Sequence, residues 1–335
     1  MVKKVNLLSF VFFICITSIL STFVAFRDIT TVEDNLYYIS NFRNTITFAD
    51  FNYEFLFELF TLIIRKLTDN YIVYFFSANL LLNSILYYTA FLIAKFYKIK
   101  YEFYLPIFIF LLLLSTWYYT EATNGLRQGL SLALMYLSLV QLVLYKKIKS
   151  FLILALMSCF FHYSSVLILP VVILYKLKLN NLFYLSCLVA VFYILGINEN
   201  IIKFLSNITN IPLYTSITAY SGTAIYRYGF QADLFIYTFG LSLLFYIATK
   251  YFLYSTYATE RLVKLYILLT LPYYIFGFGN FSNRYGVISW FFTIFINSYF
   301  LYILFHKNKN IFYVVFISLF FISLVTFLSR YVFTI

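Results

Sequence analysis

The sequence contains few charged residues, and this scarcity excludes most soluble folds. Asp, Glu, Lys and Arg together make up 11% of the 335 residues, whereas 63% are hydrophobic and the mean hydropathy is +0.89. A soluble domain of this length does not have enough polar side chains to cover so much apolar surface. The chain is therefore expected to fold in lipid.

Cysteine, proline and glycine are also scarce, with three, four and nine residues respectively. Cys15, Cys159 and Cys187 all lie inside apolar runs, with no CxxC spacing and no neighbouring His/Cys pair that would build a metal site. We interpret the three cysteines as packing residues. No metal site and no cofactor are expected.

Apolar runs long enough to cross a bilayer as helices recur along the whole chain, and the alternating pattern of an outer-membrane barrel is missing. The first run, 5–26, follows Lys3 and Lys4, is too long for a signal-peptide core and has no clear cleavage site. It is therefore expected to be a first anchor that starts in the cytoplasm. The predicted fold class is all-α: a polytopic transmembrane helical bundle, forming a single membrane domain over residues 1–335.

About eleven spans are predicted from hydropathy and from the positions of the lysine clusters. Segment 53–66, which is part of the external segment 27–70, is left out of the count as an amphipathic segment at the outer surface. A second external segment is 198–232. Region 150–176 is either one span or a helical hairpin that turns near His162, and the charge rule favours the hairpin. The predicted spans are 5–26, 71–94, 105–120, 124–145, 150–161, 163–176, 181–197, 233–250, 261–278, 284–305 and 311–330.

The net charge of +12 is dispersed among the connections between spans, so no nucleic-acid partner is expected. In the predicted topology, fourteen of sixteen lysines (all but Lys66 and Lys203) are cytoplasmic, whereas seven of eight arginines (all but Arg261) are external. Ten of twelve acidic residues, all but Glu102 and Glu260, are external too. Because a guanidinium can hold phosphate oxygens through two N–H groups, this segregation places the polar chemistry on the external face.

The segment richest in candidate site residues runs from Glu121 to Leu130. Arg127 is expected in the first turn of a helix, where the helix N-terminus and the guanidinium both favour an anion. Glu121 is the nearest carboxylate for a purely structural pairing, and Gly125 and Gly129 leave room for a bulky ligand or for a close helix. The sequence leaves both interpretations open.

His162 lies in Phe160-Phe161-His162-Tyr163-Ser164 at the tip of the predicted hairpin. A neutral histidine accepts a proton near physiological pH, as a general base for a sugar hydroxyl must. The alternative is a hairpin-tip histidine bonded only to backbone carbonyls. An external carboxylate, Glu121 or Asp233, remains a second candidate for the base.

An Arg-Tyr-Gly pattern occurs twice, at Arg227 and at Arg284, and each is expected at a helix entrance. Together with Arg127 these arginines would form a cationic clamp for a pyrophosphate, and neighbouring tyrosines would offer flat faces to sugar rings. Those tyrosines are Tyr226, Tyr228 and Tyr285.

The carboxylates of 27–70, Glu54 and Glu58 among them, are interpreted mainly as a solvated face.

Three of these segments resemble motifs of the EpsG-like branch of Wzy-type polysaccharide polymerases. In that family an "xxRQxxAxxL" helix start precedes an "FHxSAL" segment, and an arginine at a helix entrance recurs near the end. Arg127, His162 and Arg284 occupy these places, and an early "YEPG"-like segment is similar to Tyr53-Glu54-Phe55. The departures are Gly129 and Ser165 at positions where alanine is usual, and Phe55-Leu56 in place of Pro-Gly.

The resemblance implies a GT-C-like, metal-independent glycosyltransferase in the bacterial inner membrane. Its donor and acceptor would be undecaprenyl-pyrophosphate-linked glycans, joined at the external face, with membrane lipid, a chain-length regulator and a flippase of the same pathway as further partners. Arg127, Arg284 and Arg227 would hold the donor pyrophosphate, and His162 would deprotonate the acceptor. The competing functions are an O-antigen ligase, a membrane acyltransferase and a flippase for lipid-linked oligosaccharides; few ionisable groups lie at mid-depth in the spans, which disfavours the flippase.

Overall fold

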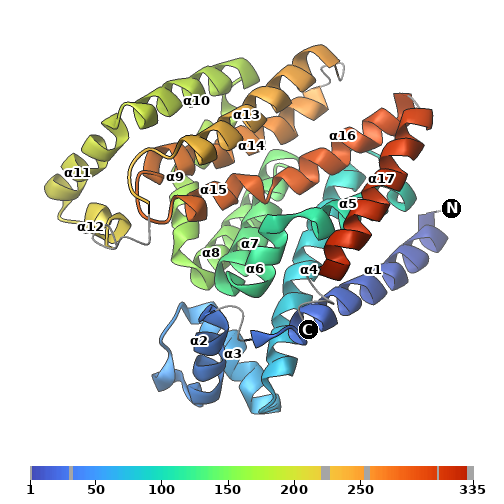
Figure 1. The fold of residues 1–335 in the computed structure, drawn as a ribbon, viewed down its shortest axis with the longest axis horizontal. Coiled ribbons are helices and arrows are strands. Elements are labelled where there is room, and N and C mark those ends of the chain that lie inside the picture. Colours follow the sequence, from blue (N-terminus) through green and yellow to red (C-terminus); the bar gives the residue numbers. More distant parts are fainter. Residues whose placement is uncertain (1, 30–32, 220–226, 253–256, 308, 330–335) are drawn as a thin grey trace. The chain divides into compact units, whose positions relative to one another are not determined.

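The computed structural model describes residues 2–29, 33–219, 227–252, 257–307 and 309–329. The regular elements in these ranges are all helices (Figure 1). The chain forms two compact units, one made of residues 1–166 with 297–335 and the other of residues 167–296. Each unit is described by itself. The all-helical prediction is confirmed for the described residues, and the GT-C-like likeness stays a prediction.

The first unit is built around α7, a helix that is buried along its length. Within α7 the side chains are buried with the exception of Arg127, and α8, α4 and α6 pack against it. The helices of this unit are α1 (Val2–Ala25), α2 (Glu33–Asn44), η2 (Phe48–Asp50), α3 (Phe55–Leu67), α4 (Tyr71–Phe96), α5 (Tyr101–Leu114), α6 (Thr116–Thr123), α7 (Leu126–Val143), α8 (Ile148–Phe161) and α17 (Lys309–Phe327).

The second unit packs α10, α11, α13 and α15 against α14. Tyr193 lies at its centre, where its hydroxyl donates to the carbonyl of Gly277 at 3.2 Å and accepts from the backbone N–H of Gln231 at 3.3 Å. The helices of this unit are α9 (Leu169–Val172), η4 (Ile173–Lys176), α10 (Leu179–Ile194), α11 (Ile197–Thr209), α12 (Leu213–Ile217), α13 (Ala232–Ile247), η5 (Ala248–Phe252), α14 (Tyr257–Phe276) and α15 (Ser282–Trp290); η3 (Tyr163–Ile168) and α16 (Thr293–Lys307) run from one unit into the other.

Four stretches of the described chain are long and apolar enough to cross a membrane: Tyr71–Phe96, Leu126–Val143, Ala232–Tyr251 and Ser282–Leu304. Two bent helix pairs raise this number to six if each pair is one span. Other predicted spans, such as 150–161, correspond to apolar helices shorter than this. The protein is thus a membrane helical bundle by length and composition, and the number eleven stays a prediction.

The structure corrects two predicted elements. Region 105–120, expected as one span, is broken at Ser115 into α5 and α6, which are bent by 71°. The hydroxyl of Ser115 accepts a hydrogen bond from the backbone N–H of Tyr118 at 3.1 Å and so starts the new helix. Segment 198–232, expected as a long external loop, contains α11 and α12 instead.

Region 150–176 is not one continuous helix. α8 ends at Phe161, the backbone of His162 is extended, and short helical turns follow from Tyr163 to Lys176. The predicted break is therefore confirmed, while the hairpin orientation of its two arms stays a prediction.

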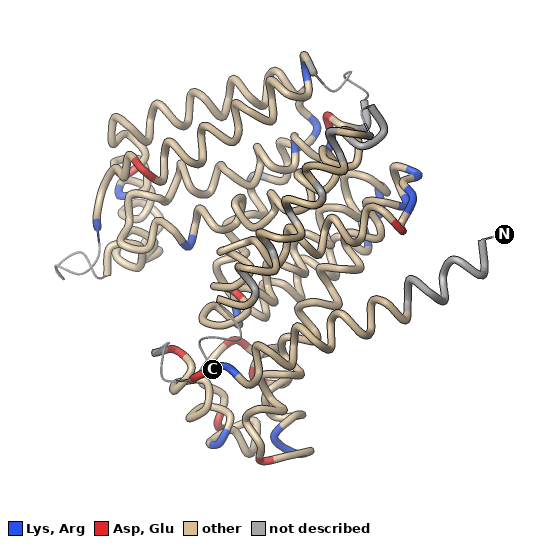
Figure 2. The backbone as a smooth tube through the Cα atoms, turned by 45° about the vertical axis from the view of Figure 1, so that its right-hand side comes forward, with Lys and Arg blue, Asp and Glu red and all other residues tan. Residues whose placement is uncertain are grey.

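Charged residues are concentrated at helix ends and in connections (Figure 2). α4 carries a charge only at Lys95, next to its last residue, and α7 only at Arg127, its second residue. This distribution within each helix is what a hydrocarbon environment requires, because a charge at mid-depth is costly.

Candidate functional site

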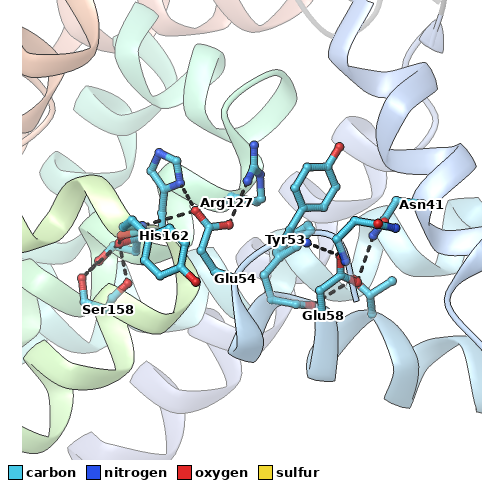
Figure 3. Close-up of polar contacts among 12 residues, drawn as sticks. Asn41, Tyr53, Glu54, Glu58, Arg127, Ser158 and His162 are labelled. Carbon is cyan, nitrogen blue, oxygen red and sulfur yellow. Dashed lines mark hydrogen bonds and ion pairs between the residues drawn. The ribbon is translucent and has the colours of Figure 1, made fainter. Parts of the chain in front are cut away.

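The main polar cluster of the first unit forms around the carboxylate of Glu54 (Figure 3). Its Oε2 accepts a hydrogen bond from Nη1 of Arg127 at 2.8 Å, and its Oε1 lies 2.7 Å from Nδ1 of His162. The Glu54 side chain is 4% exposed, that of Arg127 25% and that of His162 19%. One buried carboxylate therefore joins an arginine and a histidine that lie at the edge of the cluster.

Each of the three residues stands at the end of a helix. Glu54 occupies the N-cap position of α3 but makes no capping bond, Arg127 is the second residue of α7, and His162 follows the last residue of α8. Helix ends bring polar side chains to the rim of an apolar bundle, where burial of a charge costs less than at mid-depth. The site is therefore an assembly of three helix termini.

A second buried carboxylate, Glu58, fixes the backbone that carries Glu54. Its Oε1 accepts hydrogen bonds from the backbone N–H groups of Tyr53 at 2.8 Å and Asn52 at 3.1 Å. Its Oε2 accepts from the side chains of Asn41 at 3.1 Å and Thr45 at 3.2 Å. Glu58 is fully buried, and these four donors compensate its charge. It holds the loop before α3 against the end of α2.

Buried serines fix the backbone at His162. The hydroxyl of Ser131 in α7 donates to the carbonyl of Ser158 at 2.7 Å and also bonds the hydroxyl of Ser165. The hydroxyl of Ser158 donates in return to the carbonyl of Ser131 at 2.7 Å. Small hydroxyl-bearing residues let two helices approach closely in a membrane. This network ties the end of α8 to α7, so that His162 and Arg127 are held on neighbouring helices.

Glu121 has a different place from the one expected. The carboxylate that pairs with Arg127 is Glu54, and Glu121 packs against the two glycines that flank Arg127. A Cβ on Gly129 would lie 2.8 Å from the carbonyl oxygen of Glu121, and a Cβ on Gly125 would lie 2.6 Å from its Oε2. The two glycines therefore accommodate α6 and the Glu121 side chain, and the carboxylate partner of Arg127 is Glu54 and not the nearby Glu121.

The electrostatics of the cluster keep Glu54 ionised. Burial alone would raise the pKa of this carboxyl, but the hydrogen bond and charge of His162 and the charge of Arg127 outweigh it and lower the pKa to about 2. The Arg127 guanidinium lies 4.1 Å from the centre of the Tyr53 ring. Tyr38 also interacts with Arg127, and burial raises the pKa of Tyr38 to about 12, so that it remains a neutral hydroxyl.

An ionised Glu54 also determines which nitrogen of His162 carries the proton. A carboxylate only accepts hydrogen bonds, so Nδ1 must be the donor and Nε2 is unprotonated when the ring is neutral. Figure 3 shows the other ring nitrogen directed away from Glu54. Within the described part of the chain no hydrogen bond occupies Nε2. The His162 ring is thus arranged as a proton acceptor.

The remaining predicted site residues belong to the second unit. Arg227 donates from both terminal nitrogens to Asp233, at 3.0 and 2.9 Å, and both side chains are exposed. Tyr228 donates to Glu199, and Arg284 is the third residue of α15 with its guanidinium 4.0 Å from the centre of the Phe281 ring. Tyr285 packs on Phe276, with ring centres 5.8 Å apart, and Tyr226 lies outside the described residues.

Sequence reasoning underestimated Glu54 and Glu58. The carboxylates of 27–70 were expected mainly as a solvated face, but these two are 3% and 0% exposed. The signal that pointed to Glu54 was its place in the "YEPG"-like segment, which gave no role to its side chain. Among the residues that the structure describes, no three His, Cys, Asp or Glu side chains gather as metal ligands would.

Comparison with known proteins bears on the whole chain. No curated protein and no solved structure matches it significantly. A family model described as the EpsG family matches residues 10–334, which is nearly the full length. Arg127, His162 and Glu54, the motif residues from three separate segments, are the ones that the structure brings into contact. The chain therefore belongs to the EpsG family, a family of Wzy-like polysaccharide polymerases.

Proposed function

We propose that this protein joins polyprenyl-pyrophosphate-linked oligosaccharide repeat units into a surface polysaccharide at the external face of the bacterial inner membrane. Family membership supports a polysaccharide polymerase. The observation that carries the proposal further is the bridge of Glu54 between Arg127 and His162. It combines a proton acceptor with a cation, which are the two elements that transfer from a pyrophosphate donor requires.

In the proposed step a sugar hydroxyl of the incoming repeat unit attacks the anomeric carbon of the donor glycan. Nε2 of His162 takes the hydroxyl proton as the new carbon–oxygen bond forms. The bond between the anomeric carbon and the pyrophosphate oxygen breaks, and polyprenyl pyrophosphate leaves with the electron pair. Glu54 holds the ring through Nδ1 and stabilises the imidazolium until it returns its proton to solvent.

Arg127 is proposed to hold the donor pyrophosphate and to stabilise its charge as it departs, and Arg284 stays a predicted phosphate ligand of its own unit. Arg127 uses Nη1 for Glu54 and its Nε is buried, so it would bind the phosphate through Nη2. Arg227 has a smaller part in this proposal, because Asp233 already occupies both of its terminal nitrogens. The exposed ring of Tyr228 would offer a stacking surface for a sugar.

The proposal is tested with purified protein in nanodiscs, supplied with its native lipid-linked repeat unit, and the products are separated on a gel. Wild-type protein is expected to give a ladder of products, which disappears in His162→Ala, Arg127→Ala and Arg284→Ala. Arg43→Ala is a matched control, because Arg43 is also an arginine near a helix end but is exposed. Glu54→Gln keeps an oxygen acceptor and removes the charge, and it is expected to lower the rate at which the ladder of products forms.

Each alternative function gives a different product. No ladder but a single transfer to a different carrier would indicate a ligase. Transfer of an acyl group would indicate an acyltransferase. Movement of the lipid-linked sugar across the bilayer without any new bond would indicate a flippase. Any of these results with the confirmed native substrate overturns the proposed polymerisation.

A further inference from the structure

The helix α11 follows α10 after two residues, but it takes a different direction. The two helices are bent by 85°, and Gly196 in the connection has φ +70°, a left-handed conformation that glycine adopts without strain. No charged residue lies between Lys178 and Glu199, so α10 carries no charge. The next charged residue, Glu199, is already in the first turn of α11. α11 therefore begins where the apolar segment ends and cannot continue it in a straight line.

The residues of α11 divide among three faces. One face is apolar and exposed: Ile201 is 42% exposed, Phe204 63%, Leu205 45% and Ile208 63%. Their spacing of i, i+3, i+4 and i+7 places them on one stripe of the helix. The exposure of four large apolar side chains in one stripe is unusual for a protein surface in water.

A second face of α11 is polar and interacts with other polar groups of the unit. The hydroxyl of Ser206 accepts a hydrogen bond from the backbone N–H of Tyr214 at 2.8 Å. Glu199 accepts one from the Tyr214 hydroxyl at 3.0 Å and another from Tyr228. Lys203 lies on the same face, with its ammonium 5.7 Å from the centre of the Tyr214 ring. The polar side chains of α11 are therefore separated from its apolar stripe.

The third face fixes α11 to its unit. Asn198 and Ile202 are 6% and 5% exposed, and the amide of Asn198 donates to the carbonyl of Tyr274 in α14 at 2.6 Å and to that of Val189 in α10 at 3.2 Å. The orientation of the apolar stripe relative to α10 is therefore set by hydrogen bonds. The exposure of the stripe is therefore not a result of fraying at a helix end.

α10 also has an exposed apolar side, which reaches Leu195, directly before Gly196 in the connection to α11. Tyr184, Leu188 and Val191 in α10 and Leu195 directly after it are 63%, 50%, 48% and 64% exposed, again at helical spacing. In a membrane protein such a side faces lipid. Lipid that contacts this side of α10 would therefore lie next to the beginning of α11, and the 85° bend gives α11 a different direction from α10.

We infer that α11 is an interfacial helix, which lies in the plane of the membrane surface with Ile201, Phe204, Leu205 and Ile208 among the lipids. Its polar face, with Lys203 and Glu199, then faces water. Helices with this division of faces bury their apolar side at the boundary between headgroups and acyl chains. The occupant of the stripe is thus the bilayer. This inference does not depend on the reaction that the protein catalyses.

The test uses spin labels on the full chain reconstituted in vesicles of phosphatidylethanolamine and phosphatidylglycerol. Cys15, Cys159 and Cys187 are first replaced by serine, and single cysteines are then placed at Phe204 or Ile208 for the stripe. Lys203→Cys and Asn207→Cys provide matched controls on the polar face, because all four positions are exposed and lose no buried contact. Collision with oxygen reports lipid, and collision with a water-soluble nickel chelate reports solvent.

The ratio of oxygen to nickel accessibility is expected to be several-fold higher at Phe204 and Ile208 than at Lys203 and Asn207. Equal ratios on both faces would overturn the inference, because the stripe would then be in water. Dipolar broadening between labels on Phe204 would also overturn it and would indicate a second copy on the stripe. If the serine background does not fold, the same comparison is made by replacing Phe204 or Lys203 with tryptophan in the native chain and measuring quenching by brominated lipids above the level given by Trp117 and Trp290; equal quenching at both positions would again overturn the inference.

Discussion

Two arginine–carboxylate pairs, one in each unit, show how differently the same chemistry is used. Arg127 and Glu54 are 73 residues apart in the sequence and have 25% and 4% exposed side chains. Arg227 and Asp233 are six residues apart and have 62% and 58% exposed side chains. The distances are similar, at 2.8 and 2.9 Å, so geometry does not distinguish the two pairs.

The difference lies in what each pair must compensate. The carboxylate of Glu54 has left water, and loss of a partner leaves a charge in an apolar setting. The charges of Arg227 and Asp233 remain hydrated with or without each other. Long sequence separation and burial therefore accompany an energetic role, while a local exposed pair of ideal geometry contributes little.

Removal of Arg127 is expected to give the largest effect. Arg127→Ala leaves the buried Glu54 with His162 as its remaining side-chain partner, and the free energy of unfolding is expected to fall by about 3 kcal/mol. The measurement is denaturant or thermal unfolding of the purified protein in detergent, with the exposed Arg43→Ala as control. An unchanged free energy of unfolding would show that the buried pair has no more energetic weight than the exposed one.

Gly129→Ala is expected to disturb the buried pair indirectly. The new Cβ would meet the carbonyl oxygen of Glu121 at 2.8 Å, which forces the start of α7 away from α6 and costs about 2 kcal/mol. Gly240→Ala is the matched control, since a Cβ on Gly240 meets nothing within 4 Å and alanine favours the helix by about 1 kcal/mol. Opposite shifts in the unfolding temperature are expected, and equal shifts would contradict the close approach of α6.

The pH dependence of stability is a further test of the buried pair. Glu54 has a pKa of about 2 in the folded protein and about 4.5 when unfolded, so the unfolded state binds more protons between these values. Its contribution to stability is fully present above about pH 4.5 and is lost as the pH falls towards 2. Unfolding curves at pH 6, 4.5 and 3 are expected to show this loss, and the slope should be smaller in Glu54→Gln. An identical slope in this variant would exclude Glu54 as its source.

The smallest effect is expected from the exposed pair. Arg227→Ala should leave the unfolding temperature unchanged at physiological ionic strength, because hydrated ion pairs are screened by salt. The measurement is the same thermal unfolding experiment as for Arg127→Ala. A destabilisation comparable to that of Arg127→Ala would mean that exposure does not govern the difference between the pairs.

The long helices were predictable because hydropathy is a local property. Span 71–94 agrees with α4, and span 124–145 with α7, within a few residues. The break at Ser115 was missed, because the capping bond of one serine does not change the average hydropathy of its neighbourhood. In α11 the apolar residues recur with helical period, but the segment is less hydrophobic on average than α10 and was predicted as a loop.

The candidate site was only half predictable for a related reason. Arg127 and His162 stood out as polar residues at the ends of predicted helices, and they could be singled out without knowledge of their partners. The partner of Arg127 was sought nearby, at Glu121, whereas the structure supplies Glu54. Whether a carboxylate is solvated or buried depends on segments far away in the sequence, and a single sequence does not report these contacts.

The position of Glu54 in the chain has a consequence for biosynthesis. Glu54 leaves the ribosome before both of its partners, since Arg127 follows 73 and His162 108 residues later. Before Arg127 has been synthesised, the Glu54 carboxylate lacks the arginine that compensates its charge, so it must be either hydrated or protonated. Insertion of α7 supplies the arginine first, and completion of α8 supplies the histidine. The contacts of Glu54 with Arg127 and His162 can therefore be completed only after the end of α8 has been synthesised.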